Sequence, residues 1–129
     1  MTSTANAEIV TIDACGQTRI CTILASHLNA ASAGQLGTAL MTEFADAPDT
    51  QFILDLQHVR TMDSACLGTF VAFWKWLARF DGKLVLANVG ENIRFVFAVT
   101  RLDHVFPIYP TMPDALAAVI DQRSSLDDR

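Results

Sequence analysis

The 129-residue chain is acidic and rich in apolar residues. Its apolar fraction of 51% and charged fraction of 18% are typical of a well-buried globular domain and exclude a disordered chain. The formal net charge of -5 argues against a nucleic-acid partner, and the nine Lys and Arg residues form no basic cluster. Because chains of this length rarely form two cores, we expect one domain over residues 1–129, with its core over about 8–122 and a polar tail over 123–129.

The sequence contains no signal for export or for a membrane span. It has no run of 18 apolar residues, and its first residues, MTSTANAE, lack the basic start and apolar core of a secretion signal. Cys15, Cys21 and Cys66 are odd in number and lack the spacing of metal ligands. We therefore expect a cytoplasmic protein with reduced thiols, in which Cys15 and Cys21 pack on a strand pair.

The first half of the chain predicts two strands, a helix and a third strand. Residues 8–14 and 18–25 look extended, and Gly16–Gln17 predicts the turn between them. An amphipathic helix that Pro48 stops is indicated by large apolar residues at every fourth position: Leu36, Leu40 and Phe44. The run FILDL (Phe52–Leu56) is almost continuously apolar, which suits a central strand covered on both faces.

The second half alternates helices with strands. Helices are expected over about 65–80, over 91–100 and after Thr111, and strands over 83–89 and 104–109. Together with the first half, this order predicts an α/β fold with a mixed, mainly parallel sheet of four or five strands and about four helices.

The stretch TMDSACLGTF, which starts at Thr61, places Asp63 and Ser64 where an apolar strand unit gives way to an apolar helix. Open α/β sheets carry functional groups at such positions. Either residue could cap the helix by accepting its free amide hydrogens. The same amides would stabilise a phosphate, so Ser64 could also belong to a phosphate-binding turn or be phosphorylated itself.

Catalysis by this turn is disfavoured. No G-x-S-x-G elbow surrounds Ser64, and His27, His58 and His104 lie in no recognisable motif that could supply a base. Cys66 near a helix start could be a reactive thiolate, but its apolar neighbours favour a buried structural thiol. We therefore expect no enzyme.

No metal or cofactor site is expected either. The three histidines have no ligand partner three or four residues away, and the six glycines form neither a Walker nor a dinucleotide pattern.

The helix after this turn carries more aromatic residues than a single core face needs. On a helical wheel the core arc is formed by Leu67, Phe70, Val71, Trp74, Leu77 and Ala78. Phe73, Trp76 and Phe80 fall outside that arc. Either a neighbouring element covers these three rings or they form a docking surface, and we favour the docking surface.

The segment from FILDL through the motif MDSACLG, the strand KLVLANV and the helix ending in TRL resembles the STAS domains of bacterial anti-sigma factor antagonists. ASHLNAASAGQLGTAL also looks like an earlier segment of that family, so the resemblance covers about residues 18–120. It implies a small sheet of four or five strands with helices on one side.

The resemblance also implies a function. In that family a hydroxyl in the turn is phosphorylated by a serine kinase that is also the anti-sigma factor, and only the unmodified domain binds this kinase. The expected function is therefore a non-enzymatic partner-switching adaptor with Ser64 as its phosphorylation site, and a homodimer is left open. The partner-binding residues are expected to be Asp63, Ser64, Ala65, Cys66, Leu67, Phe73, Trp76 and Phe80.

The sequence departs from the family pattern at four positions. Ser64 matches the first of two adjacent hydroxyls, but Ala65 occupies the second. Cys66, Arg101 and Ala25 stand where the family has glycine. These departures leave an alternative open, in which the domain is a constitutive STAS scaffold, or an accessory subunit of a transporter or lipid-transport system, without a phosphorylation switch.

Overall fold

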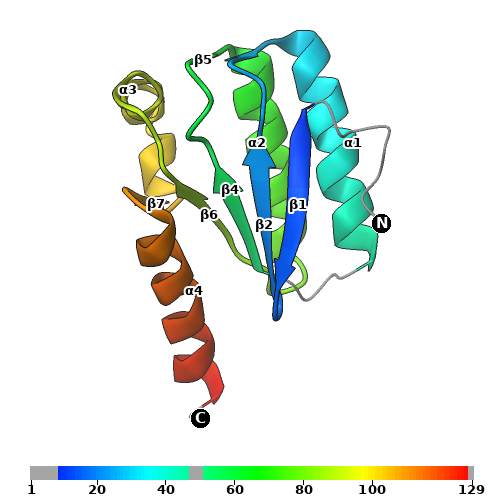
Figure 1. The fold of residues 1–129 in the computed structure, drawn as a ribbon, viewed down its shortest axis with the longest axis vertical. Helices are drawn as coiled ribbons and strands as arrows, with labels where there is room; N and C mark the ends of the chain where they lie inside the picture. The colour runs from blue at the N-terminus through cyan, green and yellow to red at the C-terminus, as the bar shows by residue number, and fades with distance from the viewer. Residues whose placement is uncertain (1–8, 47–50, 128–129) are drawn as a thin grey trace.

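The computed structural model describes residues 9–46 and 51–127 (Figure 1). The elements in this part of the chain are β1 (Val10–Cys15), β2 (Thr18–Ile23), β3 (His27–Leu28), α1 (Ala30–Asp46), β4 (Gln51–Asp55), β5 (Thr61–Met62), α2 (Ser64–Ala78), β6 (Leu84–Ala87), α3 (Glu91–Val99), the 3-10 helix η1 (Leu102–His104), β7 (Ile108–Tyr109) and α4 (Met112–Asp127).

Five strands form the main sheet in the order β1-β2-β4-β6-β7. β1 and β2 are antiparallel, and the other neighbours are parallel. The turn between β1 and β2 passes through Gly16 with a φ of 65°, which glycine adopts without steric cost. The predicted α/β class, with a mixed and mainly parallel sheet and four helices, is confirmed.

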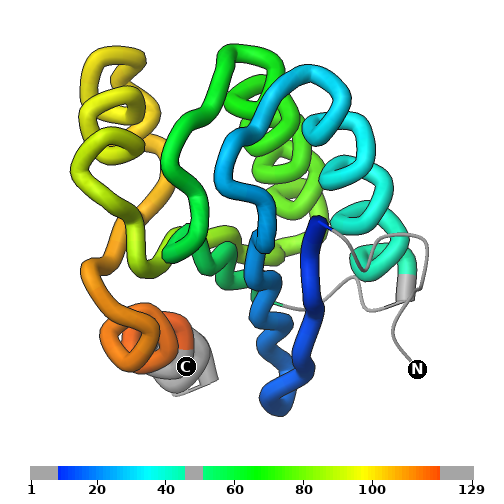
Figure 2. Tube along the Cα trace, turned by 45° about the horizontal axis from the view of Figure 1, so that its top comes forward, coloured from blue at the N-terminus to red at the C-terminus, as the bar shows by residue number. Residues whose placement is uncertain are grey.

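Helices cover both faces of the sheet. Phe52 and Leu54 of β4 belong to the large core cluster shared with α1, α2 and α3, whereas Ile53 packs in a second cluster with Ala115 and Val119 of α4. Figure 2 shows α4 well apart from the adjacent helices α1 and α2. The expectation of helices on one side is therefore wrong, and the interpretation of FILDL as a strand covered on both faces is correct.

Some local expectations differ from the structure. The short strands β3 and β5 were not predicted, and they pair in parallel as a separate two-stranded sheet. α4 runs to Asp127, whereas residues 123–129 were expected to form a polar tail after the core. Cys21 is buried as expected, but Cys15 at the end of β1 is exposed. Pro48, expected to stop the first helix, lies outside the described residues.

A buried carboxylate ties together the ends of the two central strands. Asp55, at the end of β4, is only 4% exposed. It accepts hydrogen bonds from the backbone N and side-chain Nε2 of Gln57, each at 3.0 Å, and from Nδ2 of Asn88, also at 3.0 Å. The three hydrogen bonds hold Gln57, which follows β4, and Asn88, which follows β6, against the same carboxylate. They therefore fix the directions in which the chain leaves β4 toward β5 and β6 toward α3.

Arg101 lies immediately after Thr100, the capping residue of α3, at a position where the family has glycine. Its φ of 66° lies in the left-handed region, where a side chain costs about 1 kcal/mol or more. We predict that Arg101→Gly raises the free energy of unfolding by roughly 1 kcal/mol in urea denaturation. The same substitution at exposed Arg94 inside α3 should lower it by about 1 kcal/mol. A loss of stability in both variants would contradict this account of Arg101.

Candidate partner-binding site

A two-residue bridge between β3 and β5 brings the starts of α1 and α2 together. His27 pairs with Thr61 and Leu28 with Met62, in parallel. The ring Nδ1 of His27 lies 2.7 Å from the hydroxyl of Thr61, and the backbone N of Asp63 donates to the carbonyl of Leu28 at 3.0 Å. Each helix begins two residues beyond its strand, so the two helix starts lie side by side.

Both helix starts are capped by side-chain oxygens. Asn29 accepts from the backbone N of Ser32 at 3.1 Å. Asp63 accepts from the backbone N of Ala65 at 3.0 Å and of Cys66 at 3.3 Å. These bonds satisfy amides that the first helical turn leaves free. The capping role weighed for this turn is therefore confirmed for Asp63.

Ser64 is the first residue of α2, and it is exposed together with Asp63 and Ala65. Its hydroxyl therefore stands at the surface beside a carboxylate. Within the described ranges 9–46 and 51–127, no group of three or more His, Cys, Asp or Glu side chains could hold a metal ion. No helix in those ranges is long and apolar enough to cross a membrane.

Cys66 is a packed thiol. It is fully buried, and its Sγ donates to the carbonyl of Asn29 at 3.4 Å. Burial, and secondarily the Asp63 carboxylate, raise the pKa of the Cys66 thiol to about 11, so the thiol is neutral at pH 7. Leu67 is also buried. Both residues were expected to bind a partner. Because they are buried, they do not contact a partner directly and contribute only by packing beneath the exposed residues of the turn.

The three aromatic residues of α2 separate into one core residue and two surface residues. Phe73 is only 3% exposed and packs edge-on against Phe52 at 5.0 Å between ring centroids. Its predicted place on a docking surface is wrong, because Phe44 of α1 also covers it, at 6.4 Å. Trp76 and Phe80 contact the same Phe44 but remain 37% and 44% exposed.

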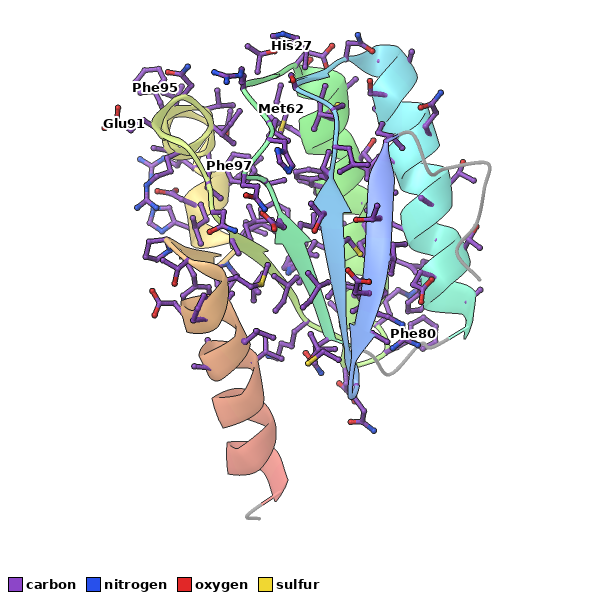
Figure 3. All side chains as sticks on the ribbon, in the orientation of Figure 1. His27, Met62, Phe80, Glu91, Phe95 and Phe97 are labelled. Carbon is purple, nitrogen blue, oxygen red and sulfur yellow. The ribbon has the colours of Figure 1, made fainter. Side chains whose placement is uncertain are left out.

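The sequence analysis missed an exposed apolar pair on α3. Phe95 is 69% exposed and Val99 is 64% exposed. Figure 3 shows Phe95 at the same end of the molecule as His27, on the helix that packs against β5. The signal was present, because Phe95 and Val99 are four residues apart and out of phase with the buried Ile93 and Phe97.

The sheet order, the paired helix starts and the capped turn define a small α/β domain with an exposed turn at the carboxyl edge of its sheet. The STAS domain family model matches residues 8–115. The chain therefore belongs to the STAS domain family.

One relative and two solved structures are similar to this chain, the last of them in its fold. BtrV of Bordetella bronchiseptica, assigned as an anti-sigma factor antagonist, is 30% identical over 91 residues, which are 70% of this chain and 78% of BtrV. The crystal structure of an anti-sigma factor antagonist from Mycobacterium paratuberculosis has a TM-score of 0.74 at 25% identity, covering 92% of this chain and 98% of that one. The phosphorylated Bacillus SpoIIAA has a TM-score of 0.67 at 20% identity, covering 85% of this chain and 98% of its own.

The packed state of Cys66 predicts slow chemistry at that thiol. In the folded protein a thiol reagent should label exposed Cys15 rapidly and Cys66 slowly, because burial blocks access and raises the pKa of Cys66. The two rates at neutral pH should differ by a factor on the order of 100, and they should converge in urea. Mass spectrometry of quenched samples measures both rates, and rapid labelling of Cys66 without denaturant would contradict the packing.

The different burial of Phe73 and Trp76 predicts different costs of truncation. Phe73→Ala should lower the free energy of unfolding by about 3–5 kcal/mol, because it leaves a cavity between α2, β4 and α1. Trp76→Ala should cost clearly less, since over a third of Trp76 already faces solvent. Chemical denaturation of both variants measures the difference. Equal losses would mean that Trp76 is a core residue.

Proposed function

We propose that this chain is a non-enzymatic partner-switching adaptor that binds an anti-sigma factor with serine kinase activity. Phosphorylation of Ser64 switches this binding off. The observation that carries the proposal is the exposed hydroxyl of Ser64 at the first position of α2. The relatives support it, since BtrV is assigned as an anti-sigma factor antagonist and SpoIIAA is known in phosphorylated and unphosphorylated forms.

The proposed partner surface combines the turn with α3. Asp63, Ser64 and Ala65 offer small and polar groups that a kinase can approach, and Phe95 and Val99 add an exposed apolar area at the same end of the molecule. Exposed aromatic residues are typical anchors of protein interfaces. A kinase held by such anchors would have the hydroxyl of Ser64 within its reach.

The cap at Asp63 explains how a phosphate could oppose binding. A phosphate at a helix start is normally stabilised by free amides. Here the Asp63 carboxylate already accepts from the amides of Ala65 and Cys66. A phosphate on Ser64 would instead add about -1.5 to -2 charge beside a carboxylate, on a chain whose formal charge is already -5. The modified turn would repel acidic groups and would be costly to desolvate in an interface.

This switch predicts a single acceptor in the turn. Incubation with the cognate kinase and ATP should add one phosphate, which Ser64→Ala abolishes, because Ala65 has no hydroxyl. Ser26→Ala, which removes another exposed serine near β3, should leave modification intact. Intact-mass measurement after the reaction gives the result. A chain that binds the kinase but stays unmodified would overturn the switch and favour a constitutive scaffold.

The partner surface predicts that Phe95 matters for binding and not for folding. Phe95→Ala should weaken binding of the kinase by about 2 kcal/mol while the melting temperature stays nearly unchanged. Truncation of the buried Phe97, two residues away on α3, should instead lower the melting temperature. Calorimetric titration and thermal melts on the same samples separate the effects. Unchanged affinity for Phe95→Ala would remove α3 from the interface.

A further inference from the structure

An apolar groove of about 470 Å³ runs between α1 and α2, and most of its lining residues are exposed. Its walls include Gly34 and Gly37 of α1 and Ala72 and Trp76 of α2. Figure 3 shows Phe80, which follows α2, at the opposite end of the molecule from His27. The groove starts within the first turns of both helices, but none of its lining residues belongs to the partner surface proposed at the turn and α3.

The groove offers few hydrogen-bonding groups to an occupant. None of the described residues that line it is charged. The hydroxyl of Thr38 donates to the carbonyl of Gly34 at 3.1 Å, and the hydroxyl of Thr69 donates to the carbonyl of Ala65 at 3.2 Å. Because both hydroxyls are bonded within their own helices, the threonines offer mainly methyl groups, and the groove suits an apolar occupant.

Packing among residues 9–46 and 51–127 does not require Gly34 or Gly37 to be glycine. A Cβ added at Gly34 would meet no atom within 4 Å, and one at Gly37 would lie 3.5 Å from the methyl carbon of Thr69, which is an ordinary contact. Glycine also weakens a helix interior relative to alanine. What the glycines do provide is space, since larger side chains there would fill the groove.

The same face carries projecting apolar side chains as well as the groove. Met41 and Trp76 both line the groove, Met41 is 38% exposed, and Phe80 lies next to Trp76 at 5.8 Å between ring centroids. A surface that carries both a hollow and the groups to fill it can pair with itself about a two-fold axis.

The charges along α2 favour the same pairing. Asp63 precedes its first residue, whereas Lys75 and Arg79 lie at its other end, with Arg79 over the ring of Trp76 at 5.2 Å. Two copies packed with their α2 helices antiparallel would place Asp63 of each near the basic end of the other. The two α2 dipoles would then be antiparallel, which is favourable because the positive end of each lies near the negative end of the other. Two chains that each carry a formal charge of -5 repel each other. This repulsion is smallest where the contact surface is uncharged and has an acidic group at one end and basic groups at the other, as this groove has.

We propose that a second copy of this chain occupies the groove. The two copies pack their α1–α2 faces together about a two-fold axis, with the exposed rings of Trp76 and Phe80 in the shared apolar contact. This inference uses the unmodified chain alone and does not depend on the Ser64 switch.

Sedimentation equilibrium of the full chain over a concentration series tests the proposal. The chain should form a dimer, and Gly34→Leu should weaken the dimer by roughly tenfold or more, because the new side chain fills the groove. Its melting temperature, extrapolated to the monomer, should not fall, since an added Cβ meets no neighbour and leucine favours a helix. Ala117→Leu, which adds a similar side chain at an exposed position of α4, should leave the dimer unchanged.

A charge reversal tests the antiparallel arrangement. Lys75→Glu should weaken the dimer, because it opposes Asp63 of the second copy, whereas Arg94→Glu makes the same change of net charge on α3 and should have a smaller effect. A chain that sediments as a monomer at every concentration, or a dimer that is insensitive to Gly34→Leu, overturns the proposal. Equal effects of the two charge reversals overturn the antiparallel arrangement. None of these results involves a kinase, so a failure here is distinct from a failure of phosphorylation.

Discussion

The pairing of His27–Leu28 with Thr61–Met62 is the constraint on which both candidate surfaces depend. It adds little area, but it joins the loops that leave β2 and β4, and the backbone N of Arg60 extends it by donating to Ser26 at 2.6 Å. The thiol of Cys66 then bonds across the two helix starts, to Asn29. Because the starts are held together, α1 and α2 run side by side, the turn at Ser64 is exposed, and a groove remains between the helices.

The long elements could be predicted because their patterns extend over several turns or a whole strand. The apolar run of β4 also predicted correctly that both faces of the sheet are covered, where the family resemblance implied only one. β3 and β5 could not be predicted, since two residues are too few to show a period of two. Their pairing joins segments more than thirty residues apart, and no local preference specifies that contact.

The helical wheel of α2 predicted the core face with an error of roughly 50°. It placed Val71 and Ala78 in the core and Phe73 outside it, whereas Phe73 is buried, Val71 is half-buried and Ala78 is exposed. A wheel gives the angle of each side chain but not the position of the neighbouring elements. Phe44 of α1 packs against one flank of α2, which moves the buried face toward α1. The aromatic excess was a real signal, but part of it serves the contact between α1 and α2.

Two glycines mark places where the chain gives up helix stability without a gain in its own packing. Gly34 and Gly68 each cost about 1 kcal/mol relative to alanine, which is appreciable against a typical folding stability of roughly 5–15 kcal/mol. A Cβ at either position would meet no atom of the described residues within 4 Å, so packing within that part of the chain does not require their small size. Gly68 lies one helical turn after Ser64, and Gly34 lines the groove. Close approach of another molecule at both positions would offset this cost. The turn and the groove then share one requirement, which is the absence of a side chain where a partner contacts the helix.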